Sequence, residues 1–426
     1  MNNLFDSLKN QKILLPRTIV FREANYKKPP KLTDILQPIN INNQNSNERQ
    51  SFEILNNSGI LQETNQSKSN SKSNSKEEEN FQFPKRRLFN PNLLSSEIEW
   101  NSVFKIGNGF HNHGKTSYIN SILQCFIYTP SFTQYILQEP HPSTCQIHNR
   151  TSNDFNQNFF CAICAFFDIV FQIRNQVNQD EKDLLFLLKN LKLIGQQFNL
   201  NQEQDAHEFY IQFLQKMIES CLFGFERLLD IRSQETTLIH SIFGGYFKNN
   251  IICSRCHFNN KVFELFLDLS INIFGSKSLE DCLLSFTKQE KIQYYCSFCR
   301  QQVLATKQLS ISHFPLILVI TLKRYNFFQK QVVKNNSFIK FPEVFNSNNF
   351  STIIPESSQK PINYLLYALV IHQGDSANTG HYISYVRNSN NIWYKFDDEK
   401  IQQVSLKTVL KEKPYMIFYR QQKSKD

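Results

Sequence analysis

The residues around position 117 have the make-up of a nucleophile segment in which a hydroxyl stands where a thiol would be expected. A loop rich in glycine and asparagine, Gly107 to Gly114, leads directly into an apolar helical pattern that begins at Ser117. Thr116 is a suitable N-cap, and Pro130 is expected to close the helix. A side chain at position 117 would lie on the first turn, beside free backbone N–H groups and the positive end of the helix dipole. That place favours a thiolate and stabilises an anionic intermediate, yet the residue is serine.

A histidine and two aspartates near the C-terminus form a candidate acid–base pair. Residues 364–371, 381–387, 392–398 and 415–419 have strand-forming patterns, and the turn signal at 388–391 predicts a hairpin. Folding the chain about residue 389, or about the midpoint of 389 and 390, places His381 opposite Asp397 or Asp398. A carboxylate facing a histidine fixes the imidazole tautomer and stabilises its protonated form. The hairpin alone does not choose between the two aspartates.

An acidic box opens a strongly amphipathic helix in the middle of the chain. The sequence Glu-Gln-Asp-Ala-His-Glu-Phe at 203–209 is followed by apolar residues at helical spacing, which indicates a core-facing stripe. Acidic residues in the first turn of a helix complement its dipole. Asp205, just before the helical pattern, is the candidate binding residue of this box.

Two pairs of cysteines have the spacing of metal ligands. Strand-forming sequence separates the pairs, and in residues 262–273 the odd positions from Phe263 are apolar, as in one half-buried strand. Four thiolates on two Cys-x2-Cys turns suit a structural zinc ion. Disulfides are the alternative, but no secretory signal is recognised and intracellular thiols stay reduced. The predicted ligands are Cys253, Cys256, Cys296 and Cys299.

A second cluster combines a histidine with three cysteines. His141 and Cys145 precede the pair Cys161 and Cys164, and this spacing is compatible with a second zinc site. The pair also lies in an apolar run, residues 159–167, where free cysteines are ordinary core residues. Both interpretations stay open.

The segment from Gly109 to Cys125 closely resembles the Cys box of the ubiquitin-specific proteases, a family of papain-like deubiquitinases. The usual form of that box is Gly-Leu-x-Asn-Leu-Gly-Asn-Thr-Cys-Tyr-Met-Asn-Ser-x-Leu-Gln. The resemblance implies that Asn112 is the oxyanion-hole residue and that Ser117 occupies the nucleophile position. This chain departs from the box at Phe110, His113, Lys115, Ser117 and Ile119.

Two further boxes carry the same resemblance. The residues around His381 and the stretch 393–398 resemble the family's His box, in which the third catalytic residue maps to Asp397, with Asp398 as the alternative. The box at 203–209 is similar to Gln-Gln-Asp-Ala-x-Glu-Phe, whose aspartate pairs with the arginine-rich tail of ubiquitin. Residues 322–325 resemble a strand that lines the channel for that tail. The implied substrate-binding residues are Asp205, Tyr325, Gly380 and Tyr382.

The resemblance also implies the fold and the domain organisation. We expect an α+β, papain-like fold with a helical thumb at about 109–235, zinc-bearing fingers at about 240–310 and a β-rich palm. The catalytic domain would cover residues 100–421 of the 426 residues. Residues 1–98 include an Asn/Gln/Ser-rich, low-complexity stretch, so this extension is expected to be largely disordered.

Charge and hydropathy narrow the classes of partner. The net charge is +10, but the basic residues are scattered, which does not favour nucleic acid as a partner. The longest apolar run, residues 314–322, is far too short to span a bilayer. We therefore expect no membrane association and an intracellular location, in the nucleus or the cytoplasm, with ubiquitin or ubiquitinated proteins as the partner.

Three functional hypotheses follow from these residues. The chain hydrolyses (iso)peptide bonds at the C-terminal glycine of ubiquitin through Ser117, or it is a catalytically inactive ubiquitin-binding pseudoenzyme or adaptor. The third hypothesis, a zinc-bearing nucleic-acid adaptor, needs a basic stripe that the sequence does not offer. The first two share every binding feature and differ only at position 117.

Overall fold

The computed structural model of the chain describes residues 82–149, 160–176, 181–328, 331–347, 362–374 and 379–423. The chain divides into two units, Met1–Gln66 and Ser67–Asp426. The first unit lies wholly outside the described residues, and so does the low-complexity stretch expected to be disordered. Every element below belongs to the second unit. No helix within the described ranges is both long and apolar enough to cross a membrane.

The thumb is a group of helices assembled around α4 (Ser117–Ile127), all of whose residues are buried. The helix ends at Ile127, before Pro130, as the sequence predicted, and Thr129 has the extended backbone that a following proline favours. Pro130 also occupies the first turn of the next helix, where its missing N–H costs nothing. The other thumb helices are α5 (Pro130–Gln138), α6 (Gln146–Asn149), α7 (Ala162–Asn175), α8 (Lys182–Lys189), α9 (Leu191–Ile194), α10 (Ala206–Leu222), α11 (Ile231–Gln234) and α12 (Leu238–Phe243).

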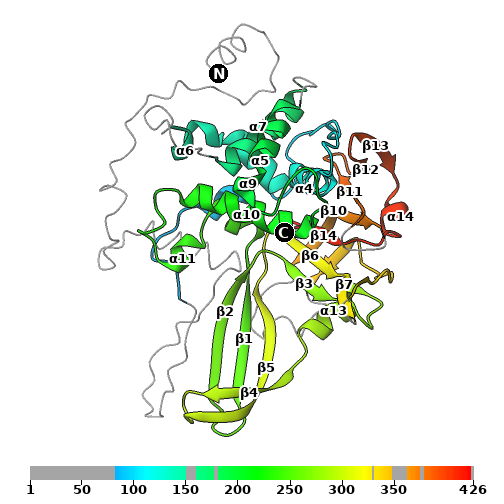
Figure 1. The fold of residues 1–426 in the computed structure, drawn as a ribbon. Helices are drawn as coiled ribbons and strands as arrows, with labels where there is room; N and C mark the ends of the chain where they lie inside the picture. Colours follow the sequence, from blue (N-terminus) through cyan, green and yellow to red (C-terminus); the bar gives the residue numbers. More distant parts are fainter. Residues whose placement is uncertain are drawn as a thin grey trace. The chain divides into compact units, whose positions relative to one another are not determined.

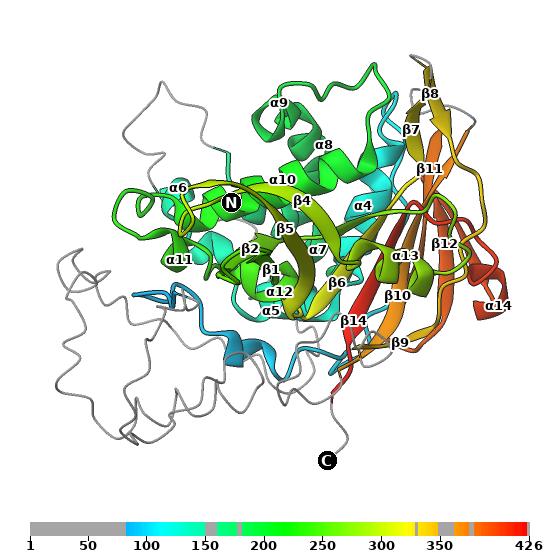
Figure 2. The same cartoon turned by 90° about the horizontal axis from the view of Figure 1, so that it is seen from below.

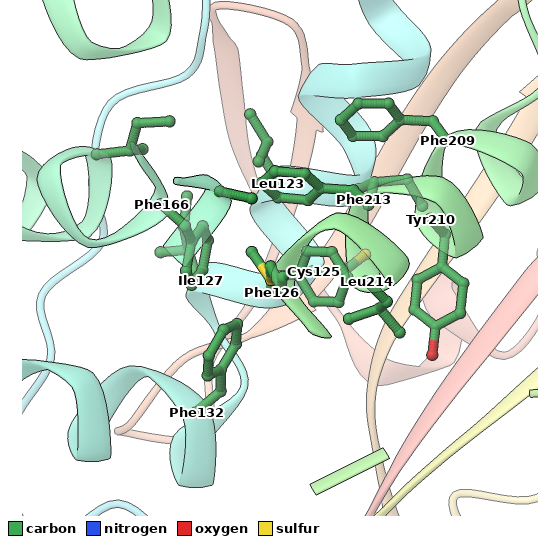
Figure 3. Close-up of a cluster of buried hydrophobic side chains, with 14 of the residues drawn as sticks. Leu123, Cys125, Phe126, Ile127, Phe132, Phe166, Phe209, Tyr210, Phe213 and Leu214 are labelled. Carbon is green, nitrogen blue, oxygen red and sulfur yellow. The ribbon is translucent and has the colours of Figure 1, made fainter. Parts of the chain in front are cut away.

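Aromatic side chains fill the space between these helices. Phe126 of α4 lies at the centre, with its ring centroid 5.6 Å from that of Tyr210 and 6.0 Å from that of Phe166. Figure 3 shows these rings converging with Phe132 of α5 and with Phe209 and Phe213 of α10 on one buried cluster. This packing fixes α4, and therefore the position of Ser117 at its first residue.

The palm is an eight-stranded sheet that packs against α4. Its strand order is β13-β12-β11-β10-β14-β6-β3, and β9 pairs with β10 off this path. In Figure 2, α4 lies between α10 and the palm strands. The strands are β3 (Leu269–Asn272), β6 (Ile317–Lys323), β9 (Val344–Asn346), β10 (Asn363–Gln373), β11 (His381–Arg387), β12 (Trp393–Asp397), β13 (Lys400–Val404) and β14 (Met416–Gln421).

Both faces of the palm sheet are buried, as the continuous apolar run of β10 requires. Side chains of one face, such as Ala368 and Val370, join the thumb core. Side chains of the other face, such as Leu369 and Ile371, pack with α13 (Leu279–Phe286) and α14 (Leu406–Val409). The alternation follows from the two-residue period of a strand.

The fingers are a four-stranded antiparallel sheet that extends away from the thumb helices (Figure 1). The order is β2-β1-β5-β4, formed by β1 (Gly245–Cys253), β2 (Asn259–Phe266), β4 (Glu290–Cys296) and β5 (Gln301–His313). The single strand expected over 262–273 is wrong, because the chain leaves the fingers after Phe266 and re-enters strand geometry as β3 of the palm. The apolar alternation continues through both strands and so hides the break. The remaining two strands, β7 (Tyr325–Phe328) and β8 (Gln331–Lys334), form a separate short hairpin.

Candidate active site and metal clusters

Ser117 begins α4 and lies against the first strand residues of the palm. The residue is 6% exposed, and its Oγ accepts a hydrogen bond of 3.2 Å from the backbone N–H of Tyr382. Tyr382 directly follows His381 in β11. The structure therefore brings the serine to the histidine-bearing strand. Within the described residues, the Ser117 hydroxyl makes no hydrogen bond to the His381 ring.

The His381 ring is bound to Asp397, although the hairpin has a different centre from the expected one. Ser384 pairs with Phe396 and Arg387 with Trp393, so β11 and β12 fold about residue 390 and not about 389 or the 389/390 midpoint. In this register, position 399 would lie opposite His381, and Asp397 is its diagonal neighbour. Diagonal neighbours across a hairpin remain within reach of a long side chain. The His381 Nε2–Asp397 Oδ1 distance is 2.7 Å.

The two adjacent aspartates have different partners. The Asp398 carboxylate lies 3.8 Å from the His381 ring, and it accepts hydrogen bonds from the side-chain amides of Asn112 at 2.8 Å and Asn120 at 2.9 Å. Burial raises the pKa of Asp397, but hydrogen bonds and charge from His381 and Lys395 outweigh it and hold that pKa below its usual value. Asp397 is therefore an ionised partner for the imidazole, and Asp398 anchors the asparagines.

Asn112 is held in one orientation from both ends of its amide. Its Oδ1 accepts a hydrogen bond from the backbone N–H of Thr116 at 3.0 Å, while its Nδ2 donates to Asp398. An amide nitrogen carries two hydrogens, so Asn112 keeps a second N–H besides the one that it donates to Asp398.

The loop before α4 fits closely onto the turn between β12 and β13. The backbone carbonyl of Asp398 accepts a hydrogen bond from the Phe110 N–H at 3.2 Å. A Cβ on Gly109 would lie 2.2 Å from that carbonyl oxygen, so this contact requires glycine. His111 adds an ion pair, with its Nδ1 3.1 Å from Glu399 Oε2.

Asp205, the expected substrate contact, is already engaged within the chain. It is the N-cap of α10, where its Oδ1 accepts from the backbone N–H groups of His207 at 2.7 Å and Glu208 at 3.2 Å. Both carboxylate oxygens also accept from the hydroxyl of Tyr415, at 2.9 and 2.7 Å.

The other expected substrate-binding residues lie at the same end of the palm. The hydroxyl of Tyr325 is 2.7 Å from Nδ1 of His372, which also lies 3.1 Å from the Lys334 ammonium. Burial and this ammonium lower the pKa of His372 to about 4. Gly380 donates its N–H to Glu203 Oε2 at 2.7 Å.

The first cysteine cluster has the geometry of a tetrahedral metal site at the end of the fingers sheet. All four sulfurs lie within 4.8 Å of one another, with Cys253–Cys299 at 3.8 Å and Cys256–Cys296 at 3.7 Å. Four sulfurs about 2.3 Å from one tetrahedral ion would stand roughly 3.8 Å apart. The residues present therefore fit a zinc ion.

The two cysteine turns have the same backbone conformation. The residue after each second cysteine, His257 or Arg300, is left-handed, with φ of 58° and 54°. Each donates its N–H to the carbonyl of the first cysteine of its turn, at 3.0 and 2.7 Å. Backbone N–H groups also point at the sulfurs of Cys253 and Cys296 at 3.4 Å, which stabilises thiolates.

The second cluster also brings its four residues together. The donor atoms of His141, Cys145, Cys161 and Cys164 lie within 4.8 Å of one another, and Nδ1 of His141 is 3.2 Å from the Cys164 sulfur and 3.7 Å from the Cys161 sulfur. The three cysteines are nevertheless buried, as core thiols would be. An imidazole nitrogen aimed at two sulfurs is the arrangement of a metal site, so this cluster could hold zinc as well.

Comparisons with known proteins agree with this geometry. The family model described as ubiquitin carboxyl-terminal hydrolase matches residues 108–419, well over half of the chain. The chain belongs to this family. The thumb, fingers and palm described above are therefore those of the ubiquitin-specific protease fold.

Human relatives show the same relationship. Human ubiquitin carboxyl-terminal hydrolase 42 is 30% identical over 327 residues, which cover 76% of this chain and 23% of that protein. Human ubiquitin carboxyl-terminal hydrolase 17-like protein 6 is 30% identical over 320 residues, covering 74% of this chain and 75% of the relative. The chain thus spans under a quarter of the first relative and three quarters of the second.

Solved structures of Ubp8 have a similar fold. The Ubp8/Sgf11/Sus1/Sgf73 module bound to ubiquitin aldehyde matches with a TM-score of 0.65 and 29% identity, covering 74% of this chain and 70% of that one. A cysteine-to-alanine variant of Ubp8, bound to monoubiquitin, matches with a TM-score of 0.64 and 31% identity, covering 74% and 69%.

Sequence reasoning missed three residues that organise this ubiquitin-specific protease site. Asn120 lies one helical turn after Ser117, so its direction was readable from the helix pattern. Glu203 pairs with Lys115 at 2.5 Å, and both differ from the neutral residues of the family boxes. Tyr415, which binds Asp205, lies 210 residues away in sequence and gave no signal.

Proposed function

We propose that this chain binds the C-terminal tail of ubiquitin between thumb and palm and hydrolyses the (iso)peptide bond at its C-terminal glycine. The observation that carries the proposal is that the nucleophile segment, with Asn112 and Ser117, meets the β11–β12 hairpin, with His381 and Asp397, at the start of α4. The ubiquitin-bound Ubp8 modules support the choice of substrate.

Each residue has a definite task in this reaction. His381, oriented by Asp397, takes the hydroxyl proton of Ser117 as the oxygen attacks the carbonyl carbon, and then gives that proton to the leaving amine. The remaining N–H of Asn112 and the first-turn N–H groups of α4 stabilise the oxyanion. Water then attacks the acyl-enzyme with His381 again as the base.

The serine determines how fast this reaction can run. A thiol with a reference pKa near ~8.5 ionises readily beside an imidazolium, whereas a serine hydroxyl must lose its proton during attack. The Ser117 Oγ also accepts a hydrogen bond from the Tyr382 N–H, so it must turn toward His381 before it can react. We therefore propose slow hydrolysis compared with a cysteine in the same place.

The second candidate function is a catalytically inactive ubiquitin binder that shields or recruits ubiquitinated proteins. Two observations favour it. Ser117 replaces the family's nucleophile, and a Ubp8 variant that has lost a cysteine side chain still binds monoubiquitin. Both candidate functions place the tail along Asp205, Tyr325, Gly380 and Tyr382, so binding alone does not separate them.

Zinc is the cofactor proposed for both cysteine clusters, with a structural role. The first cluster would tie the β1–β2 and β4–β5 connections together at the end of the fingers, and the second would tie the loop after α5 to the start of α7. Zinc thiolates need reduced cysteines, which supports an intracellular location in the nucleus or the cytoplasm. Residues 100–421 would form the catalytic domain, with the fingers at about 240–310.

The test combines binding with hydrolysis. Titration calorimetry with monoubiquitin should give a saturable binding isotherm for the natural chain, and a fluorogenic ubiquitin amide should be cleaved at a rate that His381→Ala abolishes. Binding without any His381-dependent cleavage would favour the inactive binder. Failure to bind ubiquitin would contradict both candidate functions.

A further inference from the structure

One carboxylate connects the two halves of the site. Oε1 of Glu203 lies 2.5 Å from the Lys115 ammonium, and Oε2 accepts a hydrogen bond of 2.7 Å from the backbone N–H of Gly380. Lys115 stands two residues before Ser117 in the thumb, and Gly380 stands one residue before His381 in the palm. Glu203, two residues before the N-cap of α10, therefore bridges thumb and palm beside the reacting groups.

The sheet alone holds His381 weakly. The β10–β11 ladder ends at the pair Gln373–His381, and the β11–β12 ladder ends at Ser384–Phe396, three residues short of the histidine. His381 is thus the terminal residue of its strand and has a ladder neighbour on one side only. Asp397 binds the ring, but a ring contact does not fix the backbone that carries it.

The missing backbone contacts come from the thumb. On one side of His381, the Gly380 N–H donates to Glu203, and on the other side the Tyr382 N–H donates to Ser117 Oγ. Gly380 is also closely packed, because a Cβ there would lie 2.2 Å from Nε2 of His372. A shift of Glu203 would therefore move the peptide that leads directly into His381.

The Lys115–Glu203 pair is a paired departure from the family boxes. Those boxes have asparagine at the position of Lys115 and glutamine at that of Glu203, and both residues are neutral. A glutamine could accept the Gly380 N–H through its amide oxygen, but it has no negative charge to pair with a lysine. The positive charge of Lys115 is thus balanced by the negative charge of Glu203. The side chain of Glu203 is only 22% exposed. A charge-assisted hydrogen bond to the Gly380 N–H is stronger than a neutral one.

We propose that Glu203, held by Lys115, is a positioning residue that sets the place of His381 through the backbone of Gly380. The inference rests on the proposed hydrolysis for its kinetic consequence, but its structural part stands without that reaction. Glu203 touches neither the substrate bond nor the His381 ring in this arrangement. Its loss should therefore change turnover and not substrate affinity.

The experiment compares five variants of the full chain, each made with Ser117 and with the Ser117→Cys substitution. Glu203→Ala removes the carboxylate, Glu203→Gln keeps an acceptor, Lys115→Asn removes only the cation, and a double variant combines Lys115→Asn with Glu203→Ala. Glu208→Ala is the matched control, since Glu208 lies in the first turn of α10 and binds Gln197 instead of the palm. Amide hydrogen exchange of residues 379–382 is measured with kcat and KM for a ubiquitin amide.

Glu203→Ala should speed exchange at Gly380 and lower kcat about tenfold while KM changes little, because small misplacements of a base are costly. Glu203→Gln should recover most of the loss, and the effect of Lys115→Asn should vanish in the Glu203→Ala background.

Exchange and kcat that match those of Glu208→Ala would overturn the proposal. So would a rise in KM alone, which would make Glu203 a substrate contact. If both the serine and the cysteine forms are silent, hydrolysis fails as the function, and the exchange at Gly380 decides this proposal by itself.

Discussion

The side-chain amide of Asn112 donates to the carboxylate of Asp398 at 2.8 Å, across 286 residues of sequence. Asp398 follows Asp397 directly, yet the two serve different groups: Asp397 binds the imidazole of His381 and Asp398 binds the asparagines of the nucleophile segment. One turn of the palm therefore orients both the imidazole of His381 and the amide of Asn112. A substitution of Asp397 should therefore affect the His381 ring, whereas a substitution of Asp398 should affect Asn112 and Asn120.

Asp398→Ala should lower kcat for ubiquitin amide cleavage by roughly 10- to 100-fold, because the Asn112 donor loses its anchor. The buried Asn120 amide would lose its shortest hydrogen bond and keep only the two of 3.3 Å to the carbonyls of Phe110 and His111, which should also cost about 0.5–1.5 kcal/mol of unfolding free energy. Asp398→Asn, which keeps one acceptor, should fall between the wild type and Asp398→Ala. The measurements are hydrolysis by the Ser117→Cys form and urea denaturation. An Asp398→Ala variant with wild-type turnover would show that Asn112 needs no anchor.

Much of the site was predictable because its residues lie at the ends of elements with strong local patterns. The apolar spacing after Ser117 defined α4, and β11 begins at His381 as the sequence predicted. The cysteine spacings predicted two clusters, and the structure brings both sets of donor atoms together. In each case a short sequence pattern determined a helix, strand or turn, and that local structure positions the side chain in the site.

The contacts between distant segments were beyond local patterns. The register of the β11–β12 hairpin differs from the expected one because the turn between Arg387 and Trp393 is centred on residue 390, and turn composition does not determine loop geometry to one residue. The bond between Tyr415 and Asp205 depends on how β14 enters the sheet. Pro130 follows the end of α4 as expected, but it also begins α5, since proline suits both places.

Metal analysis should find two zinc ions per chain. Cys256→Ser should reduce the count to one by disrupting the fingers cluster, and Cys161→Ser should do the same at the second cluster. Cys282→Ser is the matched control, because Cys282 is a buried thiol of α13 outside both clusters. Elemental analysis of the four proteins checks the prediction. If Cys161→Ser retains the zinc content of the wild type, the second cluster is a group of core cysteines.

Acid should destabilise the chain partly through His372. Its pKa in the folded state is about 4, below the reference value of 6.5, because burial and Lys334 disfavour its charge. The unfolded chain then binds more protons between these values, so the stabilisation is fully present above pH 6.5 and is lost as the pH falls toward 4. Between pH 7.5 and 5 the wild type should lose about 2 kcal/mol more unfolding free energy than His372→Gln.

Urea denaturation at the two pH values measures this difference. Burial lowers the pKa of His240 and of His313 to about 4 as well, but both remain in the variant and cancel in the comparison. His111→Gln is the control, since the hydrogen bond with Glu399 raises the pKa of His111 and its removal should not reduce the acid-induced loss. Equal pH dependence in the wild type and His372→Gln would mean that His372 is already charged in the folded protein.

Ser117→Cys should convert a slow or silent site into a reactive one. The helix N-terminus, His381, Asp397 and Asn112 already surround position 117, so the variant gains a thiolate–imidazolium pair that the hydroxyl cannot form. The natural chain should bind ubiquitin but resist ubiquitin-based electrophiles that capture thiolates, and the variant should react with them. Side-by-side cleavage of a fluorogenic ubiquitin amide should show the variant faster by roughly 10²-fold or more, the scale on which a misplaced or poorly activated nucleophile is costly.

The outcome also separates the two candidate functions. Equal rates would show that the site is built for a serine nucleophile and that the Tyr382 N–H releases Ser117 during attack. Activity confined to Ser117→Cys would identify the natural chain as a ubiquitin binder whose machinery is intact apart from one atom. Silence from both proteins would place the defect in the nucleophile loop, where His113 and Lys115 depart from the family box and bind Glu181 and Glu203.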